Sequence, residues 1–426
     1  MRWKPPGSRD TLSAVMTPRI SSIALFAAGF AAACAQPQPV AESPSPYDYE
    51  LGEGQVGLVP LPAGEPWPDF SIGWQMREEL LDAAARSLVY LSKPSSQTFF
   101  PYGEYGEITH DHMVASVTRF RDVLETATSA EDFLRLLNQD FEVWVARGRS
   151  NTGDVFFTGY GTPILDGSKT PDEVHRYPLY AKPDDLEKDP RTGEILGRKL
   201  PDGSYAPYWS AAELQQNGVL QGKELVWLAN PFDAYTAQVQ GSAVIRLPDG
   251  SLYEVGYAAK NGHEYRSVGM ILVEEGKIPK SRLSLQALRD YFAQHPAEAD
   301  RVLPMNPSFV FFQESAGGPY GCLGQKVTAL HSIATDKDVF PRAALAYVEA
   351  RLPDFASDGR LVQRPHRFFA LDQDRGGAIR SAGRCDVYMG LGDDAMARAG
   401  HVASRGRMYY LFLKPGRNGP NSLSMQ

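Results

Sequence analysis

Apolar residues near the start of the folded region recur at helical spacing. Two sets fall three or four positions apart, as expected for one face of an amphipathic helix. They are Leu81, Ala84, Leu88 and Leu91, and then Val117, Phe120, Val123 and Ala127. Ser129 followed by Asp132 marks the start of a third helix, over Glu131–Gln139.

Beyond Phe141 the pattern changes to that of strands. Short runs at Glu142–Val145 and Val155–Thr158 predict the first two. Residues 181–225 are polar and rich in turn residues, which predicts a surface loop. Two alternating runs, Tyr235–Leu247 and Ser251–Tyr257, flank Pro248-Asp249-Gly250 and predict a β-hairpin, because proline fixes one turn dihedral and glycine adopts the other.

The last third mixes short helices with short strands. Helices are predicted at Ser284–Gln294 and Ala297–Leu303. The predicted strands are Phe309–Gln313, Leu345–Arg351, Phe368–Leu371, Asp386–Met389 and Met408–Leu413. Short strands separated by short helices favour a β-barrel over a doubly wound sheet.

The N-terminus has the pattern of a targeting segment. Arg19 precedes a mainly apolar run over residues 20–33, which as a helix would span about 21 Å of a bilayer core of roughly 30 Å. Residues 1–33 therefore predict a signal peptide rather than a membrane span. The run ends in Ala31-Ala32-Ala33-Cys34, which resembles a bacterial lipobox and predicts a lipid on Cys34; ordinary cleavage nearby, giving a soluble periplasmic protein, is the alternative. Residues 34–50, rich in Pro, Gln and Ser, predict a tether.

Composition narrows the possible functions. The 426 residues favour two domains, and 43 Lys plus Arg against 51 Asp plus Glu give a net charge of −8, which argues against nucleic acid as the main ligand. Three cysteines exclude a disulfide framework and a cysteine-rich zinc module. After Cys34, Cys322 and Cys385 remain, and whether they pair stays open.

Few segments carry recognisable catalytic chemistry. The histidines of His110-Asp111-His112 lie two residues apart and would not share a helix face, so a metal site there is not expected. No Gly-x-Ser-x-Gly elbow or phosphate-binding loop is present. Asp374 ends a hydrophobic strand before Gly376-Gly377, and Asp386 opens the next strand, as expected for carboxylates beside a cleft. Cys385 would face away from Asp386 and pack in the core.

Five further segments, in order over more than 200 residues, carry a family resemblance. They are Thr158–Pro163, Phe232–Ser242, Gly256–Ser267, Asn306–Phe312 and Asp374–Asp386. With them the chain resembles the membrane-bound lytic murein transglycosylase A family across nearly the whole mature region. It departs from the family pattern at Tyr160-Gly161, at Asn230, at Arg375 and after Asp336.

The resemblance implies a mainly β fold with α-helices (α+β). A double-psi β-barrel catalytic domain would comprise residues 51–160 plus 262–418, with its three-aspartate part at about 325–415. A second, smaller β-barrel over residues 161–261 would be inserted into it, with a groove between the two for a glycan strand. Residues 419–426 would be a flexible tail.

The same resemblance implies the site and the reaction. Asp386 would be the catalytic acid and base, with Asp374 and Asp336 in support. The bond cleaved would join N-acetylmuramic acid to N-acetylglucosamine in peptidoglycan, without water, leaving 1,6-anhydro ends in cell-wall turnover. The expected substrate-binding residues in the insert are Gln240, Gly241, Ser242, Tyr257, Lys260, Asn261 and Tyr265.

One carboxyl group suffices for such a lyase, because the C6 hydroxyl of the substrate is a tethered nucleophile. The hypothesis requires a raised pKa for Asp386, by desolvation from Val387, Tyr388 and Phe369. No cofactor or metal is expected. The expected location is the periplasmic face of the outer membrane, with peptidoglycan glycan strands and other cell-wall enzymes as partners. A non-catalytic peptidoglycan-binding lipoprotein, and hydrolysis by Asp374 with Asp386, are the alternatives.

Overall fold

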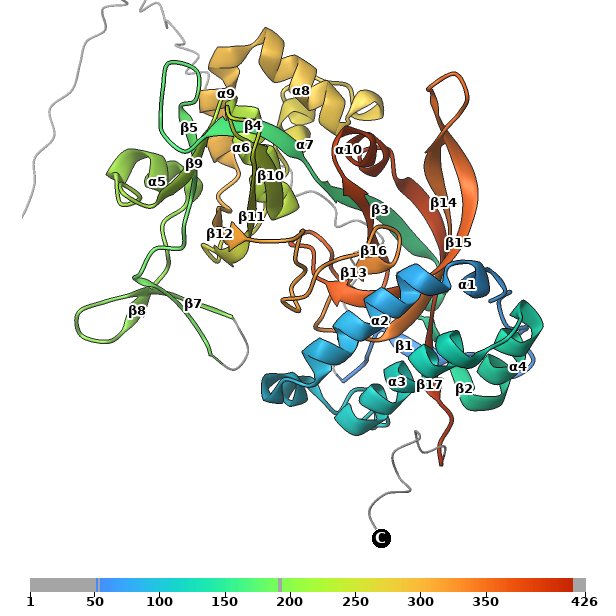
Figure 1. Cartoon of the computed structure of the whole chain (residues 1–426). Coiled ribbons are helices and arrows are strands. Elements are labelled where there is room, and N and C mark those ends of the chain that lie inside the picture. Colours follow the sequence, from blue (N-terminus) through green and yellow to red (C-terminus); the bar gives the residue numbers. More distant parts are fainter. Residues whose placement is uncertain (1–50, 53, 191–193, 417–426) are drawn as a thin grey trace, which may run out of the picture. The chain divides into compact units, whose positions relative to one another are not determined.

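The computed structural model describes residues 51–416, apart from residues 53 and 191–193 (Figure 1). The predicted signal peptide, the lipid site at Cys34, the tether and the C-terminal tail lie outside the described residues. Within the described part, no helix is both long and apolar enough to cross a bilayer. Cys322 and Cys385 are both free thiols.

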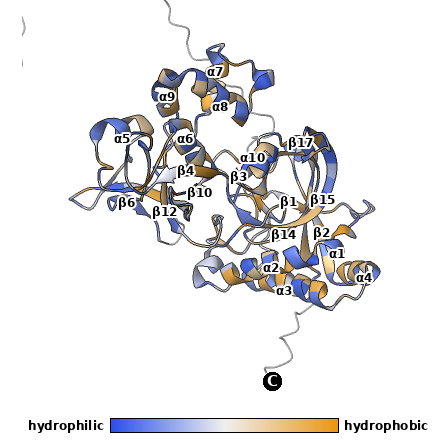
Figure 2. Ribbon diagram, turned by 45° about the horizontal axis from the view of Figure 1, so that its top comes forward, coloured by the Kyte–Doolittle hydropathy of each residue, from blue (hydrophilic) through white to orange (hydrophobic). Residues whose placement is uncertain are grey.

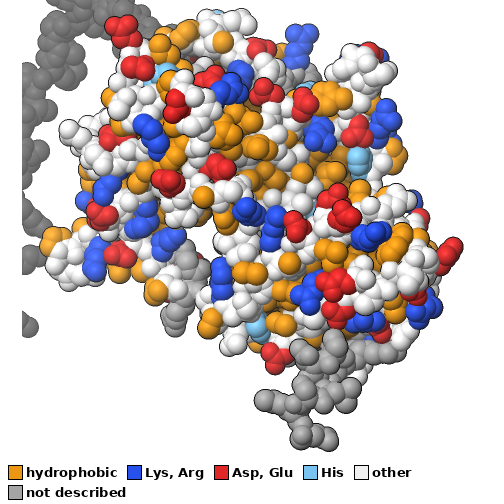
Figure 3. Space-filling view, in the orientation of Figure 1, with side chains coloured by type: hydrophobic (Ala, Val, Ile, Leu, Met, Phe, Trp, Pro, Cys, Tyr) orange, Lys and Arg blue, Asp and Glu red, His pale blue; other side chains and the backbone are white. Residues whose placement is uncertain are grey.

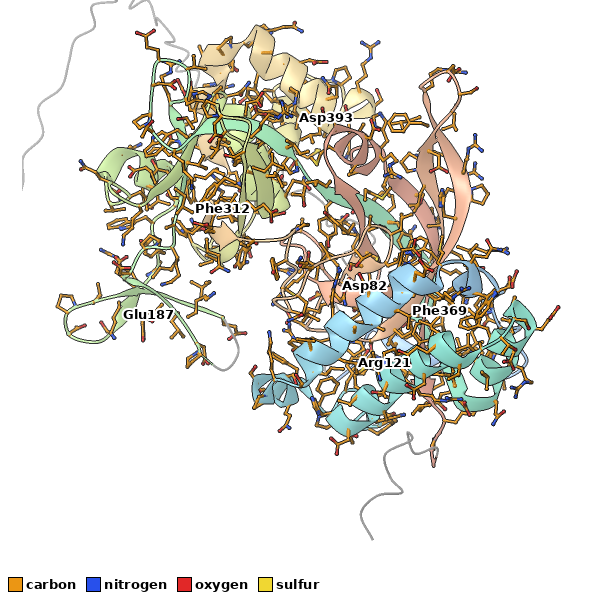
Figure 4. The ribbon with its side chains drawn as sticks, viewed as in Figure 1. Asp82, Arg121, Glu187, Phe312, Phe369 and Asp393 are labelled. Carbon is orange, nitrogen blue, oxygen red and sulfur yellow. The ribbon has the colours of Figure 1, made fainter. Side chains whose placement is uncertain are left out.

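Three predicted helices are confirmed close to their expected bounds. They are α2 (Arg77–Leu91), α3 (His110–Thr126) and α4 (Ala130–Asp140), preceded by the short α1 (Ile72–Gln75). Ser129 caps α4 by accepting a hydrogen bond from the Asp132 amide, as the sequence predicts. Figure 2 shows hydrophobic residues along one side of these helices. Those residues pack with Phe369 of β15 (Leu361–Asp374), which Figure 4 shows beside the helices.

Six strands close into a ring, which we call the first barrel. In order around the ring they are β17 (Ala403–Leu413), β14 (Leu345–Phe355), β15, β13 (Ser332–Ala334), β16 (Arg384–Leu391) and β3 (Val155–Thr162), and β3 pairs back onto β17. The pairs β13–β15 and β16–β3 are parallel and the others antiparallel. β2 (Phe141–Ala146) and β1 (Leu58–Pro60) extend β17 outward. The predicted α+β fold built around a β-barrel is confirmed, and the structure shows that this barrel is closed by six strands.

The second barrel is a separate six-stranded sheet. Its order is β12 (Val310–Ser315), β11 (Leu252–Lys260), β10 (Ser242–Arg246), β4 (Ile164–Ser168), β9 (Glu224–Leu228) and β5 (Tyr177–Tyr180). A bridge from Ala181 to Phe312 joins its two edge strands, and Phe312 is buried in its interior (Figure 4). β3 and β4 are nearly continuous, so one stretch of chain belongs to both barrels.

The predicted hairpin is confirmed, but its first strand is shorter than expected. Ser242–Arg246 pairs with Leu252–Gly256, whereas the expected strand residues 235–240 belong to helix α6 (Pro231–Gln240). Asn230 caps this helix, Pro231 occupies its first turn, and Gly241 ends it at a φ of 74°. These residues favour the start and end of a helix, and the segment is therefore helical although its apolar residues alternate as in a strand.

Residues 181–225 are also more ordered than predicted. They form a small sheet of β6 (Leu186–Lys188), β7 (Ile195–Lys199) and β8 (Tyr205–Ala206), followed by helix α5 (Ala211–Asn217) and β9. Leu186, Tyr208 and Leu214 anchor the segment by packing on Phe311. The segment is predicted to be a loop because most of its residues are polar, whereas its fold depends on these few apolar residues.

The remaining elements are short. Helices α7 (Val268–Glu274), α8 (Leu285–Gln294) and α9 (Pro296–Val302) pack on α6, and α10 (Asp393–Ala399) packs on β16 and β3. The 3₁₀ turns lie at Pro94–Phe99, Arg149–Asn151, Lys280–Arg282 and Leu303–Met305. The predicted helices near residues 284–303 and the five predicted strands after Asn306 are all present, most of them longer than expected.

Candidate active site

Asp386 lies near the start of β16, on the face opposite the core. Its neighbours Cys385 and Val387 are buried inside the first barrel, so Asp386 and Tyr388 share the other face. The parallel partner β3 places Thr158 beside Asp386 and Tyr160 beside Tyr388. Asp386 is half-buried, and its Oδ1 accepts no hydrogen bond from any described residue.

The environment of Asp386 favours its protonated form. Burial raises the pKa of Asp386 to about 6, and the negative charge of Asp374 acts in the same direction. A hydrogen bond with the Thr158 side chain and the positive charge of Arg384 oppose that rise. Of the apolar neighbours predicted to desolvate Asp386, Val387 points into the barrel and Phe369 packs against Phe70, whereas Tyr388 shares its face.

Asp374 ends β15 close to Asp386 and is held by three donors. The Tyr160 hydroxyl donates to Oδ2 at 2.8 Å, and the amides of Cys322 and Arg375 each donate to Oδ1 at 2.8 Å. Burial raises the pKa of Asp374, and these hydrogen bonds partly offset that rise. The Tyr160 ring also packs on Tyr388, with ring centroids 5.2 Å apart. Asp374 is therefore a fixed, oriented carboxyl group.

Asp336 is buried and organises loops. Its Oδ2 accepts a hydrogen bond from the Ser381 amide at 2.8 Å, and its Oδ1 accepts one from the Asp338 amide at 3.2 Å. Ser381 lies in the loop that leads from Asp374 to Asp386. Asp336 thus shapes the connection between the other two aspartates, and both of its oxygens are occupied.

Two of the expected substrate-binding residues, Gln240 and Ser242, connect the two barrels, and Gly241 lies between them. The Gln240 Oε1 accepts a hydrogen bond from the Gly161 amide at 2.9 Å, and Gly241 is the left-handed cap after it. The buried Ser242 hydroxyl lies 3.1 Å from that of Thr162, which lies 3.1 Å from the Tyr388 hydroxyl. This chain of contacts ties the second barrel to the strand that carries Asp386.

The Asn261 side chain forms hydrogen bonds with backbone groups inside the second barrel. Its amide nitrogen donates to the carbonyls of Trp209 and Pro307, and its oxygen accepts from the Phe309 amide at 2.9 Å. The side chain is buried, so its polar atoms are already satisfied by backbone partners. The predicted sugar contact by Asn261 stays a prediction, and it would require the side chain to exchange one of these backbone partners for a sugar.

Tyr257 and Tyr265 are the most exposed of the predicted contact residues, whereas Gln240, Gly241 and Lys260 are half-buried. Tyr257 is 41% exposed and Tyr265 37% exposed, and the Tyr265 hydroxyl lies 3.1 Å from that of Tyr235. Lys260 is half-buried at the end of β11, the strand that also carries Tyr257.

The sequence reasoning overlooked Thr158 and Tyr160 as members of the site. Their two-residue spacing on a strand was the available signal, because it places both side chains on one face. It also overlooked a buried ion pair in the first barrel between Lys337 and Asp372, whose carboxylate also accepts hydrogen bonds from Thr335 and Tyr410. No sequence motif marks that pair.

A cavity of about 220 Å³ opens elsewhere, between residues 99–103 and 337–342. Neither Asp374 nor Asp386 lines it. The two aspartates lie instead on one face of the first barrel, on either side of Ala334, and this face combines a raised-pKa carboxyl group, a fixed second carboxyl group and neighbouring tyrosines. Such a face suits proton transfer to and from a sugar substrate.

Comparisons with known proteins agree with this reading. The model of the MltA-specific insert domain matches residues 156–313, and the 3D domain model matches residues 331–412. Membrane-bound lytic murein transglycosylase A of Escherichia coli K12 is 32% identical over 301 residues, which cover 70% of this chain and 76% of that protein. The Vibrio cholerae protein of the same name is 32% identical over 270 residues, covering 63% and 68% respectively.

Solved structures show the same fold. A membrane-bound lytic murein transglycosylase from Agrobacterium tumefaciens superposes with a TM-score of 0.65 at 26% identity, covering 80% of this chain and 94% of that one. E. coli MltA with bound chitohexaose gives a TM-score of 0.62 at 26% identity, covering 85% and 95%. The resemblance seen in the sequence is confirmed: this chain belongs to the membrane-bound lytic murein transglycosylase A family and is a lytic murein transglycosylase.

Proposed function

We propose that this enzyme cleaves the bond between N-acetylmuramic acid and N-acetylglucosamine in peptidoglycan and leaves 1,6-anhydro-muramic acid ends. The observation that carries the proposal is Asp386: a half-buried carboxyl group with a pKa of about 6 and an oxygen that accepts no hydrogen bond from the described residues. Such a group is protonated in a useful fraction near neutral pH, and its Oδ1 has no hydrogen bond to a described residue that a substrate would have to displace.

In the proposed mechanism Asp386 acts twice. Its proton passes to the glycosidic oxygen as the bond from the anomeric carbon breaks, and the N-acetylglucosamine residue leaves as an alcohol. The resulting carboxylate then accepts the proton of the muramic acid C6 hydroxyl, whose oxygen bonds to the anomeric carbon. The ring closes, Asp386 regains its proton, and no water is consumed.

The surroundings support this cycle in distinct ways. Asp374, fixed by Tyr160 and two amides, supplies negative charge that raises the pKa of Asp386 and stabilises a positively charged transition state. We propose that Asp336 supports both by holding the loop between them. Tyr257 and Tyr265 offer exposed rings for sugar faces, whereas Gln240, Gly241 and Ser242 support the connection between the barrels.

The test is mass spectrometry of the fragments that the purified protein releases from peptidoglycan sacculi. We expect anhydro-ended fragments from the native protein and none from Asp386→Asn. Asp393→Asn is the matched control, because Asp393 is an exposed carboxylate at the start of α10 (Figure 4) and its loss leaves release intact. Reducing-end products would instead indicate hydrolysis by Asp374 with Asp386, and tight binding without release would indicate a binding protein.

We also propose where the enzyme works. A lipid on Cys34 would hold it at the periplasmic face of the outer membrane, where it acts in cell-wall turnover beside other cell-wall enzymes. Mass spectrometry of the mature N-terminal peptide from cells tests the lipid. An unmodified N-terminus, or a Cys34→Ser protein that stays in the membrane fraction, would contradict it.

A further inference from the structure

Gln373 carries a fully buried amide in the strand that ends at Asp374. It lies at an irregularity of β15, where the register with β13 passes directly from Asp372 to Asp374. The irregularity leaves Gln373 without a partner residue on β13. Because a buried amide needs hydrogen-bond partners, the side chain of Gln373 has to find them elsewhere in the first barrel.

The amide nitrogen of Gln373 donates to two groups on α2. Its Nε2 lies 2.8 Å from the Ala83 carbonyl oxygen and 3.0 Å from the Ser87 hydroxyl. Ala83 and Ser87 lie four positions apart on the buried side of α2. Asp82, labelled in Figure 4, is exposed, and Figure 3 shows acidic and basic side chains on the face of the molecule that α2 covers in Figure 1. The buried side of α2 therefore supports Gln373.

The amide oxygen of Gln373 extends these contacts into β13 and the loop before it. The Ser332 hydroxyl donates to Gln373 Oε1 at 2.6 Å and accepts a hydrogen bond from the Thr328 amide at 2.9 Å. The Thr328 hydroxyl accepts one from Arg86 Nη1 at 2.8 Å, and Arg86 precedes Ser87 on α2. The hydrogen bonds thus run from α2 through Gln373, Ser332 and Thr328 back to α2. We call these residues the Gln373 network.

The Gln373 network adjoins the loop that holds Asp374. Gly321 of this loop packs so closely that a β-carbon on it would lie 2.6 Å from the Gln373 carbonyl oxygen and 3.1 Å from Cγ of Asp374. The next residue, Cys322, donates its amide to Asp374 Oδ1 at 2.8 Å. The same loop continues to Thr328, a member of the network. The network therefore contacts both the strand that carries Asp374 and the loop that donates to it.

We propose that Gln373 is a positioning residue of this enzyme, which fixes the irregularity of β15 and so holds Asp374 on the face of Asp386. This inference rests on the roles proposed above for the two aspartates. In a regular strand Gln373 would lie opposite Ala334, and Asp374 would point to the other face, because a shift by one residue reverses every side chain. The partners on α2 and Ser332 stabilise the irregular register, since only there does the buried amide reach them.

Gln373→Met tests the proposal, because methionine is similar in size and forms none of the three hydrogen bonds. We expect kcat on purified glycan strands to fall by about 10- to 100-fold, as for a misplaced supporting group. KM is expected to stay unchanged, because the buried Gln373 does not reach a glycan. With Asp374 further from Asp386, the pKa seen in the pH profile of kcat/KM is expected to shift below 6.

Ser87→Ala is the milder variant, which tests the network if Gln373→Met does not fold. It removes one hydrogen bond of the amide nitrogen, so kcat is expected to fall about threefold, the order of one neutral hydrogen bond. Asn306→Leu is the matched control. Asn306 is another buried amide, before β12 of the second barrel, and its oxygen accepts a hydrogen bond from the Arg266 amide at 3.0 Å. Its replacement is expected to lower the melting temperature and leave the pH profile unmoved.

Two results would overturn the proposal. One is a folded Gln373→Met protein with native kcat and a native pH profile, and the other is an equal change of both in Asn306→Leu. NMR titration of the Asp386 carboxyl carbon, assigned by the loss of its signal in Asp386→Asn, measures its pKa without turnover. An identical pKa in the native and Gln373→Met proteins would also contradict the proposal. Failure of the anhydro-forming reaction is seen separately, in the products of the native protein.

Discussion

Asp374 and Asp386 lie opposite the same residue, Ala334, from its two sides. Ala334 ends β13, which pairs with β15 in parallel and with β16 in antiparallel orientation. An irregularity in β15 makes the register step from Asp372 to Asp374, so that Gln373 is skipped. The skipped Gln373 bonds instead to the Ser87 hydroxyl of α2. This bulge is what brings the second carboxyl group to the face of the first.

The raised pKa of Asp386 predicts the pH dependence of catalysis. The protonated form starts the reaction, so kcat/KM is expected to fall as pH rises through about 6, the pKa of the free enzyme. Rates on purified glycan strands between pH 4 and 9 measure this decline. Asp386→Asn, which is expected to release no anhydro-ended fragments at any pH, gives the background rate for these measurements. If kcat/KM of the native protein instead declined near pH 4, Asp386 would not be desolvated.

The same group predicts a stability change. The native state raises the pKa of Asp386 from 3.8 to about 6, so its stabilising contribution is complete below pH 3.8 and is lost as pH rises through 6. Asp386→Asn is therefore expected to be more stable than the native protein above pH 6, by about 1–2 kcal/mol after allowance for partial exposure. Urea unfolding at pH 4 and pH 7.5 tests this. An advantage of the same size at both pH values would contradict it.

Tyr160 is expected to act on catalysis through Asp374. Tyr160→Phe removes a donor to Asp374, so the pKa of Asp374 rises and its negative charge near Asp386 decreases. We expect kcat to fall about tenfold, the order of one charge-assisted hydrogen bond, and the pKa seen in the rate profile to shift below 6.

Tyr208→Phe is the matched control for Tyr160. Its hydroxyl donates to the Asp185 carboxylate at 3.0 Å, away from the aspartates of the first barrel. An equal fall in kcat for both variants, with an unmoved rate profile, would indicate a general loss of structure rather than a role at the site.

The buried Lys337–Asp372 pair is expected to control the stability of the first barrel. Both side chains are fully buried, so Lys337→Met leaves the Asp372 carboxylate without its countercharge and costs about 3–5 kcal/mol at neutral pH. The double variant Lys337→Met with Asp372→Leu is expected to regain most of that loss, because no charge is then buried. Urea unfolding measures both. A double variant as unstable as the single one would show that the pair is needed for packing rather than charge balance.

The sequence alone determined the local elements and the family. Helical spacing located α2, α3 and α4, the Ser129 cap located a helix start, and Pro248-Asp249-Gly250 located the hairpin turn. These signals are local, because each depends on residues within a few positions of one another. Five segments between Thr158 and Asp386, taken in order, indicated the family, and alternation along β16 placed Cys385 in the core.

Tertiary structure decided which residues meet. The contact of Tyr160 with Asp374 joins residues 214 positions apart, and the contact of Gln240 with Gly161 ties the second barrel to a strand of the first. The burial of Asn261 and the pairing of Lys337 with Asp372 depend in the same way on partners far along the chain. A sequence pattern records the face on which a side chain lies, whereas desolvation and charge depend on what the folded chain packs against that face.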